Sequence, residues 1–145
     1  MNYHPLVGRR RRAIGFLEGE DWLDAKPSFD ELEKKERETL HNRFNNWLDG
    51  GVFKKYHHGF NAPKHRKCYV FKFQGLRLYG FLCNPKALDP GFQLCVLTSS
   101  TNKRQFETET VYLERAMRML RDVRSKEAIA ATYPEYNRGK KVWSN

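Results

Sequence analysis

The side chains best suited to chemistry in this 145-residue chain lie in one basic stretch, residues 50–88. The stretch contains eight lysines and arginines, three histidines and no aspartate or glutamate. The eight cations are Lys54, Lys55, Lys64, Arg66, Lys67, Lys72, Arg77 and Lys86. Aromatic residues are interleaved with them, and so dense a run of positive charge predicts a polyanionic partner, with nucleic acid as the first choice. A basic face kept for solubility is the alternative.

Charge and composition narrow the class of protein further. The net charge is +10, and the acidic residues gather between Leu17 and Glu38, so the two signs are segregated along the chain. Apolar runs reach only about six residues, which is too short to span a membrane, and no basic amphipathic helix points to a membrane surface. Cys68, Cys83 and Cys95 lie in apolar runs without a partner at metal-ligand spacing. They predict buried, reduced thiols and hence a cytoplasmic protein.

Motifs of several enzyme classes are missing from the sequence. No Ser/His/Asp arrangement, phosphate-binding glycine loop or cluster of metal ligands occurs. Hydrolase, nucleotide-binding and metalloenzyme mechanisms therefore lack support from motifs. We expect no cofactor and no metal site.

The elements that must position the basic residues can be predicted from hydrophobic periodicity and turn signals. A helix is predicted over Phe29–Asp49, because Ser28 and Glu31 form a capping box and two glycines follow the last apolar residue. The two-residue spacer Gln74 and Gly75 predicts a tight β-hairpin. The remaining predicted elements are strands at Arg11–Leu17, Cys68–Phe73, Leu76–Cys83 and Phe92–Ser99, and a helix at about Glu109–Arg124.

Together these elements predict a single α/β (α+β) domain over residues 1–145, with its core at about residues 11–124. A four-stranded, mostly antiparallel sheet is expected to pack against two N-terminal helices and one C-terminal helix. Residues 1–12 are expected to form a basic N-terminal arm, and residues 125–145 a basic, aromatic tail. Alternation along the second hairpin strand places Arg77 on the same face as aromatic side chains.

Three stretches, taken in order, resemble the RelE/HigB-like toxin superfamily, including its phage-derived Gp49-like branch. Trp22 and the helix ending at Trp47–Gly51 are similar to the family's N-terminal helical hairpin. Residues 68–82, CYVFKFQGLRLYGFL, resemble the family's β-hairpin, and Arg77 falls on its arginine. Residues 102–116 resemble a third stretch of the family, which contains a basic pair, a threonine and an Arg-Ala dipeptide. The matching residues are Lys103 and Arg104, Thr108, and Arg115 with Ala116.

This resemblance implies a RelE-like fold and the toxin of a type II toxin–antitoxin system. Such a toxin is an endoribonuclease (mRNA interferase) that cleaves mRNA on the ribosome, and a helix-turn-helix antitoxin neutralises it. Arg77 would hold the scissile phosphate, because a guanidinium binds phosphate bidentately, and Lys103 and Arg104 would cradle the RNA backbone. His65 would act as general acid or base, because imidazole titrates near neutral pH. Further RNA contacts are expected from Lys54, Lys55, Lys64, Arg66, Lys67, Lys72 and Tyr79.

Other interpretations remain open at this point. His65 could be an ordinary surface residue, and Arg77 could pair with a carboxylate of the long helix. A non-catalytic nucleic-acid-binding protein would explain the charge equally well, and Glu107 and Glu109 beside the basic pair favour it. A ParE-like inhibitor of gyrase is the third class. Cleavage of mRNA in a translation extract would separate the first class from the other two.

Overall fold

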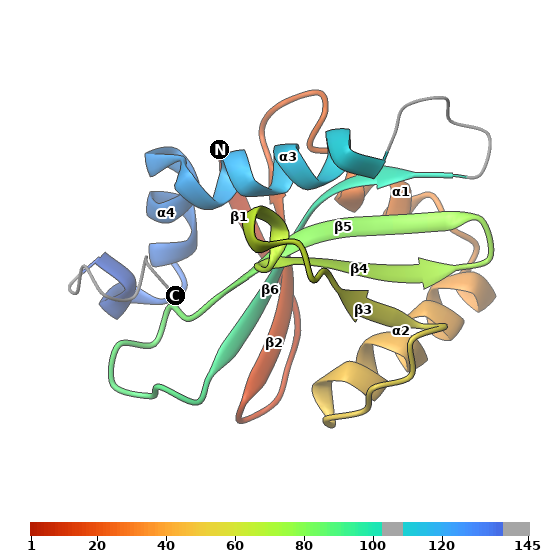
Figure 1. Cartoon of the computed structure of the whole chain (residues 1–145), viewed down its shortest axis with the longest axis horizontal. Coiled ribbons are helices and arrows are strands. Elements are labelled where there is room, and N and C mark those ends of the chain that lie inside the picture. Colours follow the sequence, from red (N-terminus) through yellow and green to blue (C-terminus); the bar gives the residue numbers. More distant parts are fainter. Residues whose placement is uncertain (103–108, 138–145) are drawn as a thin grey trace.

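The computed structural model of the chain describes residues 1–102 and 109–137, and its centre is one six-stranded sheet (Figure 1). The strands are β1 (Asn2–Gly8), β2 (Arg12–Glu18), β3 (His57–Gly59), β4 (Cys68–Phe73), β5 (Leu76–Cys83) and β6 (Gln93–Thr101). Their order across the sheet is β1-β2-β6-β5-β4-β3. Neighbouring strands are antiparallel except β2 and β6, which run parallel. The general α/β class is confirmed, but the sheet has six strands where four were expected.

Helices cover both faces of this sheet, as Figure 1 shows for α3 above and α2 below the β4–β5 hairpin. The helices are α1 (Ala25–Asp30), α2 (Lys34–Leu48), α3 (Glu109–Arg121) and α4 (Val123–Ala130), with short 3-10 helices η1 (Pro63–His65) and η2 (Pro134–Asn137). Successive strand residues therefore enter different cores. Phe16 packs beneath α1 and α2, and Leu17 packs on the side of α3 and α4. In the described part of the chain, no helix has the length and apolar character needed to cross a membrane.

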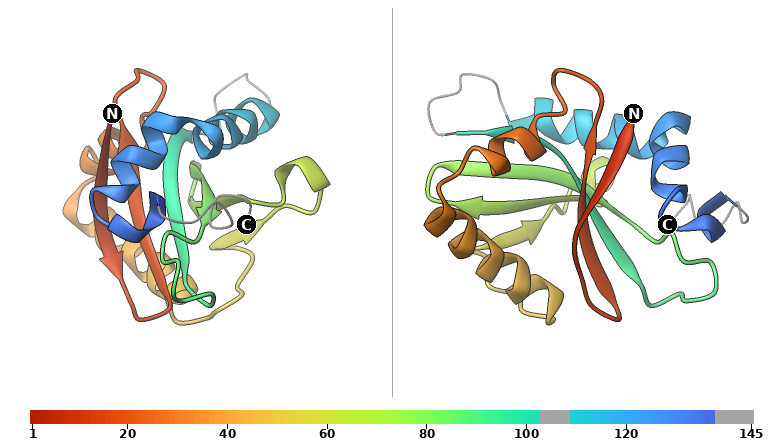
Figure 2. Two further views of the ribbon diagram at one scale, coloured as in Figure 1. Left: turned by 90° about the vertical axis from the view of Figure 1, so that its left-hand side faces the viewer. Right: turned by 180° about the vertical axis from the view of Figure 1, so that it is seen from behind.

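The two additional strands lie at the edges of the sheet. Residues 2–8, expected as part of a basic arm, form β1, which Figure 2 shows alongside β2. Tyr3 is buried from this strand, and the irregular pairing between Pro5 and Val7 accommodates the proline at an edge position. At the opposite edge, the three-residue strand β3 pairs with β4 inside a segment that the sequence suggested was a loop. The buried His57 holds that short strand in place.

The helix predicted over Phe29–Asp49 is two helices. The N-terminus of α2 lies at Glu33 and Glu36, where the Glu36 side chain accepts a hydrogen bond from the Glu33 backbone N–H. Ser28 does not start a helix, because it lies inside α1 and its hydroxyl contacts the Ser100 hydroxyl of β6. A tertiary contact has thus overridden the local capping signal.

The C-terminal helix is also divided. α3 ends at Arg121, and Asp122 then caps α4 by accepting a hydrogen bond from the backbone N–H of Arg124 at 2.8 Å. The residues after Arg124, expected as a tail, therefore begin as helix. The side chain of Tyr136 in η2 is fully buried in the core beneath α3 and α4.

The β4–β5 hairpin forms as predicted. Phe73 pairs with Leu76, so Gln74 and Gly75 are the two loop residues. Alternation along β5 is confirmed as well: Tyr79, Phe81 and Cys83 share one core, while Leu78 lies in the other. The pairing with β6 shifts after Tyr79, where the β6 residue Thr98 has no opposite partner. At this irregularity the two backbones approach closely.

Gly80 is required at that close approach, and its replacement gives a first prediction. A Cβ on residue 80 would lie 2.2 Å from the carbonyl oxygen of Val96, which is backbone and cannot rotate away. We expect Gly80→Ala to lower the free energy of unfolding by at least about 2 kcal/mol, as overpacked cores do. Gly59→Ala is the matched control, because a Cβ there meets nothing nearer than 3.6 Å. Urea unfolding followed by tryptophan fluorescence checks this, and equal stability of the two variants would contradict the register described here.

Candidate nucleic-acid interface

Two cations face each other across the β4–β5 hairpin, next to its turn. Lys72 and Arg77 are directly opposite in the strand register. Lys72 is two residues from Val70 on β4, and Arg77 is two residues from Tyr79 on β5. Val70 and Tyr79 lie in the core beneath α3, and strand residues two apart share a face, so the side chains of Lys72 and Arg77 are on the α3 side of the sheet. Partial burial lowers the pKa of Lys72, and the Arg77 guanidinium lowers it further. Like charges directly opposite each other destabilise a sheet, so the direct opposition of these two cations does not itself stabilise the hairpin.

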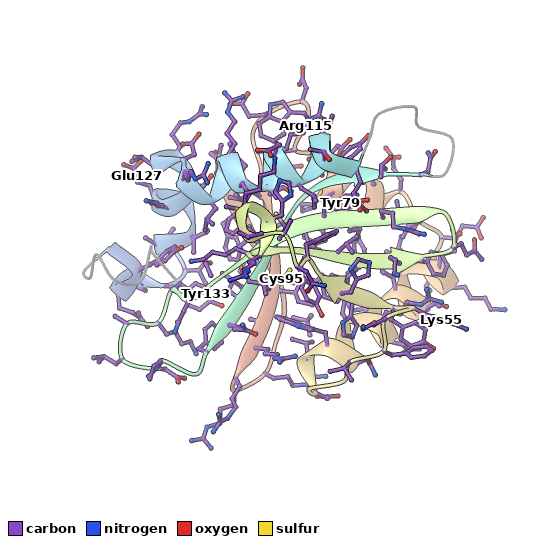
Figure 3. The ribbon with its side chains drawn as sticks, in the orientation of Figure 1. Lys55, Tyr79, Cys95, Arg115, Glu127 and Tyr133 are labelled. Carbon is purple, nitrogen blue, oxygen red and sulfur yellow. The ribbon has the colours of Figure 1, made fainter. Side chains whose placement is uncertain are left out.

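Glu109 adds a carboxylate to these two cations. It is the first residue of α3, and one of its oxygens accepts a hydrogen bond of 2.7 Å from the hydroxyl of Tyr79. The Tyr79 ring stacks on Tyr112 at 5.3 Å between centroids (Figure 3 labels Tyr79 on β5). Burial raises the pKa of Tyr79, and the hydrogen bond to Glu109 raises it further, so the hydroxyl remains a donor. The carboxylate charge also acts on Lys72, where it opposes the lowering of the pKa.

We call Lys72, Arg77, Tyr79 and Glu109 the charged cluster. Its arginine is fixed by the hairpin turn itself: Nη1 of Arg77 donates to the carbonyl oxygens of Gln74 at 2.8 Å and Leu76 at 3.0 Å. Within the described residues, Arg77 lies within ion-pair distance of no carboxylate, neither of α2 nor elsewhere. The alternative in which Arg77 pairs with the long helix therefore has no support.

An open hollow of about 640 Å³ connects the charged cluster to the basic residues near β3. Its lining includes Lys54, His58, Arg66 and Tyr69, and it ends at Glu109 of the cluster. A second hollow of about 490 Å³ continues from Arg66 and includes Lys67 and Gln93. We call the two hollows together the basic groove.

The other predicted RNA-binding lysines lie outside the groove lining. Lys55 is exposed on the loop between α2 and β3, where Figure 3 labels it at the edge of the molecule. Lys64 in η1 lies 3.9 Å from Glu114 of α3, so part of its charge is compensated. Lys103 and Arg104 lie outside the described residues.

His65 is not close to Arg77. Its imidazole is buried, and Nε2 contacts Oε1 of Glu114 at 2.9 Å. His65 lies three residues before Cys68, which pairs with Phe81 of β5. Phe81 is four residues from Arg77 along β5, a distance of roughly 13 Å. The hydrogen bond from His65 lowers the pKa of Glu114. The structure therefore joins His65 to α3, at the far end of the hairpin from the charged cluster.

Glu109 is the group that sequence reasoning did not assign to the site. It was noted only as an acidic residue near the predicted basic pair. The available signal was its place as the first residue of the predicted helix 109–124, the next predicted element after the strand that pairs with β5. Finding it required knowing that α3 returns across β5, which depends on packing between distant segments.

A buried polar network supports one wall of the basic groove. The hydroxyl of Tyr69 donates to Nδ1 of His57 at 2.6 Å, and Nε2 of His57 donates to Oδ1 of Asn46 at 2.8 Å. Burial lowers the pKa of His57 to about 4, and the nearby charge of Arg12 contributes. The imidazole is therefore neutral at pH 7, and it orients Tyr69 at the groove.

Comparison of the chain with protein-family models, with curated proteins and with solved structures finds no match. In the described residues, no group of three or more His, Cys, Asp or Glu side chains could hold a metal ion. The chemistry of the site must therefore be inferred from its own residues.

The His57 network predicts how stability depends on pH. The pKa of His57 is about 4 in the folded chain and about 6.5 when unfolded. Above pH 6.5 the His57 imidazole is neutral in both the folded and the unfolded chain. As the pH falls from 6.5 toward 4, mainly the unfolded chain takes up a proton at His57. We expect this group to remove up to about 3 kcal/mol of stability between pH 6.5 and 4. Urea unfolding at a series of pH values measures it.

Aspartate and glutamate side chains in general also take up protons as the pH falls toward 4. The contribution of His57 is therefore measured by comparing how the stability of each variant changes with pH. His57→Gln is expected to show a shallower loss of stability on acidification than the unmodified chain. His58→Gln, on the neighbouring strand position, is expected to retain most of the original pH dependence. Parallel curves for His57→Gln and the unmodified chain would show that His57 is not held neutral by its surroundings.

Proposed function

We propose that this protein binds single-stranded RNA in the basic groove and cleaves it at the charged cluster. The observation that carries the proposal is a carboxylate, Glu109, which Tyr79 holds at the groove and whose charge acts on Lys72. The charge of Arg77 acts on the same tyrosine. In the described residues, no carboxylate lies within ion-pair distance of Lys54 or Arg66, so both remain available to phosphates. Aromatic side chains in the groove lining, Phe60 and Tyr69, suit the stacking of unpaired bases.

The reaction that fits these groups is transfer of the phosphate to the neighbouring 2′-oxygen. Glu109 takes the proton of the 2′-hydroxyl as that oxygen attacks the phosphorus. Arg77 holds the non-bridging oxygens, where negative charge develops. Lys72 protonates the 5′-oxygen as its bond to phosphorus breaks, because an ammonium of lowered pKa is a better acid. The products are a 2′,3′-cyclic phosphate and a free 5′-hydroxyl, and Tyr79 positions Glu109 throughout.

The resemblance to RelE/HigB-like toxins extends this proposal to a biological class. The order strand, two helices, three-strand meander and helix is present as β2, α1, α2, β4–β6 and α3. The edge strands β1 and β3 and the helix α4 would then be additions to a RelE-like arrangement. On this proposal the protein is a toxin that cleaves mRNA on the ribosome, and a helix-turn-helix antitoxin would block the basic groove. Glu109 replaces His65 as the proposed general base.

A second candidate, a non-catalytic RNA-binding protein, is favoured by one observation. The Glu109 carboxylate already accepts a hydrogen bond from Tyr79. If that bond only anchors the start of α3, the charged cluster would hold RNA without cleaving it. The two candidates agree on where RNA binds and differ in whether the 2′-hydroxyl reacts.

Removal of the proposed base tests the cleavage step. We expect Glu109→Gln to lower the single-turnover rate of RNA cleavage by about 10²- to 10⁴-fold, the usual contribution of a general base. RNA affinity should be unchanged or slightly higher, because a negative charge has been removed from the site. Glu127→Gln is the matched control, because Glu127 is an exposed residue of α4 (labelled in Figure 3). Ribosome-bound mRNA in a translation extract and a labelled oligonucleotide are the two substrates.

Further variants separate the possible outcomes. Lys72→Met and Arg77→Met should weaken both binding and cleavage, and circular dichroism verifies that each variant is folded. A 2′-O-methyl group at the cleaved nucleotide should abolish the reaction. Full activity of Glu109→Gln would remove Glu109 from the mechanism. Salt-sensitive RNA binding by the unmodified chain without any cleavage would establish the non-catalytic candidate instead.

A further inference from the structure

Four consecutive arginines occupy the connection between β1 and β2 and the first position of β2, and we call these residues, Arg9–Arg12, the arginine turn. The backbone N–H of Arg9 donates to the carbonyl oxygen of Arg12 at 2.7 Å, which leaves Arg10 and Arg11 at the tip. Figure 1 shows this hairpin end at the bottom of the molecule, away from the β4–β5 turn and its charged cluster. The arginine turn is therefore a second concentration of positive charge.

The outer two arginines have a structural role at the end of α2. Arg9 donates to Oδ1 of Asn45 at 3.0 Å and lies 3.3 Å from Asp49. Arg12 donates to the carbonyl oxygen of Trp47 at 2.6 Å, and its guanidinium lies over the Trp47 ring. Cations at a helix C-terminus satisfy free carbonyls and interact favourably with the helix dipole. Packing and capping thus account for these two side chains.

The inner two arginines have no such role. Arg10 and Arg11 are exposed, and within the described residues neither side chain forms a hydrogen bond or an ion pair. Turn positions favour Gly, Asn, Asp, Ser and Pro for conformational reasons that arginine does not share. Two more positive charges between Arg9 and Arg12 also repel their neighbours. Neither turn conformation nor a direct hydrogen bond or ion pair therefore explains arginine at these two positions.

The surroundings of the tip indicate what Arg10 and Arg11 could bind. All four arginines line an open hollow of about 510 Å³ beside the C-terminal end of α2. The carbonyl oxygen of Arg11 accepts a hydrogen bond from the backbone of Gln93 at 2.9 Å, and Gln93 also lines the basic groove. The arginine turn therefore lies next to the end of the groove farthest from Glu109.

The chemistry of the turn favours the backbone of a duplex over a single strand. Guanidinium groups bind phosphate oxygens regardless of base sequence. In the hollow of the arginine turn, the lining contains no aromatic ring on which an unpaired base could stack, whereas single-strand sites use such rings. Double-stranded RNA is recognised mainly through phosphates, 2′-hydroxyls and shape.

We propose that Arg10 and Arg11 form a second phosphate-binding site, which docks the protein on the backbone of double-stranded RNA. The choice of RNA over DNA rests on the proposed function, but the site is separate from the charged cluster. A structured RNA would be held at the arginine turn while its single-stranded extension enters the basic groove.

The test measures binding of a labelled 20-base-pair RNA duplex by fluorescence anisotropy between 50 and 300 mM KCl. We expect the double variant Arg10→Ala/Arg11→Ala to bind about tenfold or more weakly at 150 mM salt, with a salt slope smaller by about 2. The control is Arg118→Ala/Arg121→Ala, which removes the same charge from exposed positions on α3 and should change affinity less than about threefold. Arg10→Lys/Arg11→Lys should retain most of the affinity, because the charges remain.

Several outcomes would overturn the proposal. Equal losses in the two alanine variants would mean that only net charge matters, and unchanged duplex affinity would remove the site. Binding of a DNA duplex with the same affinity and the same dependence on Arg10 and Arg11 would overturn the choice of RNA. The choice would also be overturned if the double alanine variant lost affinity for anionic phosphatidylglycerol vesicles but kept its affinity for the RNA duplex. The alanine variant should cleave a short single strand at the unmodified rate. Absence of cleavage by the unmodified chain would contradict the proposed function alone, because the duplex measurement does not depend on it.

Discussion

Burial of β6 on both faces is the constraint on which the rest of the structure depends. Every residue from Leu94 to Ser100 is buried, and β6 lies between β2 and β5 in the middle of the sheet. A strand of this kind requires cover on each side. α1 and α3 lie against opposite faces of β6, and α2 and α4 complete the two cores. The polar end of β6 is satisfied within the fold, because Ser100 hydrogen-bonds to the Asp24 carboxylate and Ser99 to the Trp22 carbonyl. These contacts fix the start of α1 against the sheet.

The same constraint determines where charge can be placed. Helices cover the middle of the sheet, so the lysines and arginines that the sheet itself carries remain accessible at its hairpin turns and along the β3–β4 edge. The charged cluster lies at one such turn and the arginine turn at another, and the basic groove follows the edge between them. α3 has two functions in this arrangement, because the helix that covers β5 also carries Glu109 to the cluster.

The sequence predicts those parts of the fold that depend on neighbouring residues. The β4–β5 hairpin follows from a two-residue spacer and strict alternation, and that alternation also places Arg77 beside aromatic side chains. β1 and β3 were missed although each pairs with the next strand along the chain, because their own residues include a proline and three histidines, which are poor strand signals. The division of the long helix was missed because Ser28 contacts Ser100, 72 residues away in the sequence. Glu109 took the place of His65 as the proposed general base for the same reason. Only the path of α3 shows that Glu109 contacts Tyr79 of β5, whereas His65 contacts Glu114.

Locally unfavourable features concentrate at the two hairpin turns. Gln74 is the only non-glycine with positive φ among the described residues, at 52°, and Lys72 faces Arg77 directly across the same hairpin. The arginine turn combines poor turn formers with mutual repulsion. At each turn, however, arginines also stabilise the structure: Arg77 binds two carbonyl oxygens of its own turn, while Arg9 and Arg12 bind the end of α2. Their hydrogen bonds restrain the turns, so the remaining cations are presented on a restrained backbone, which would reduce the conformational entropy lost in the phosphate binding that we propose.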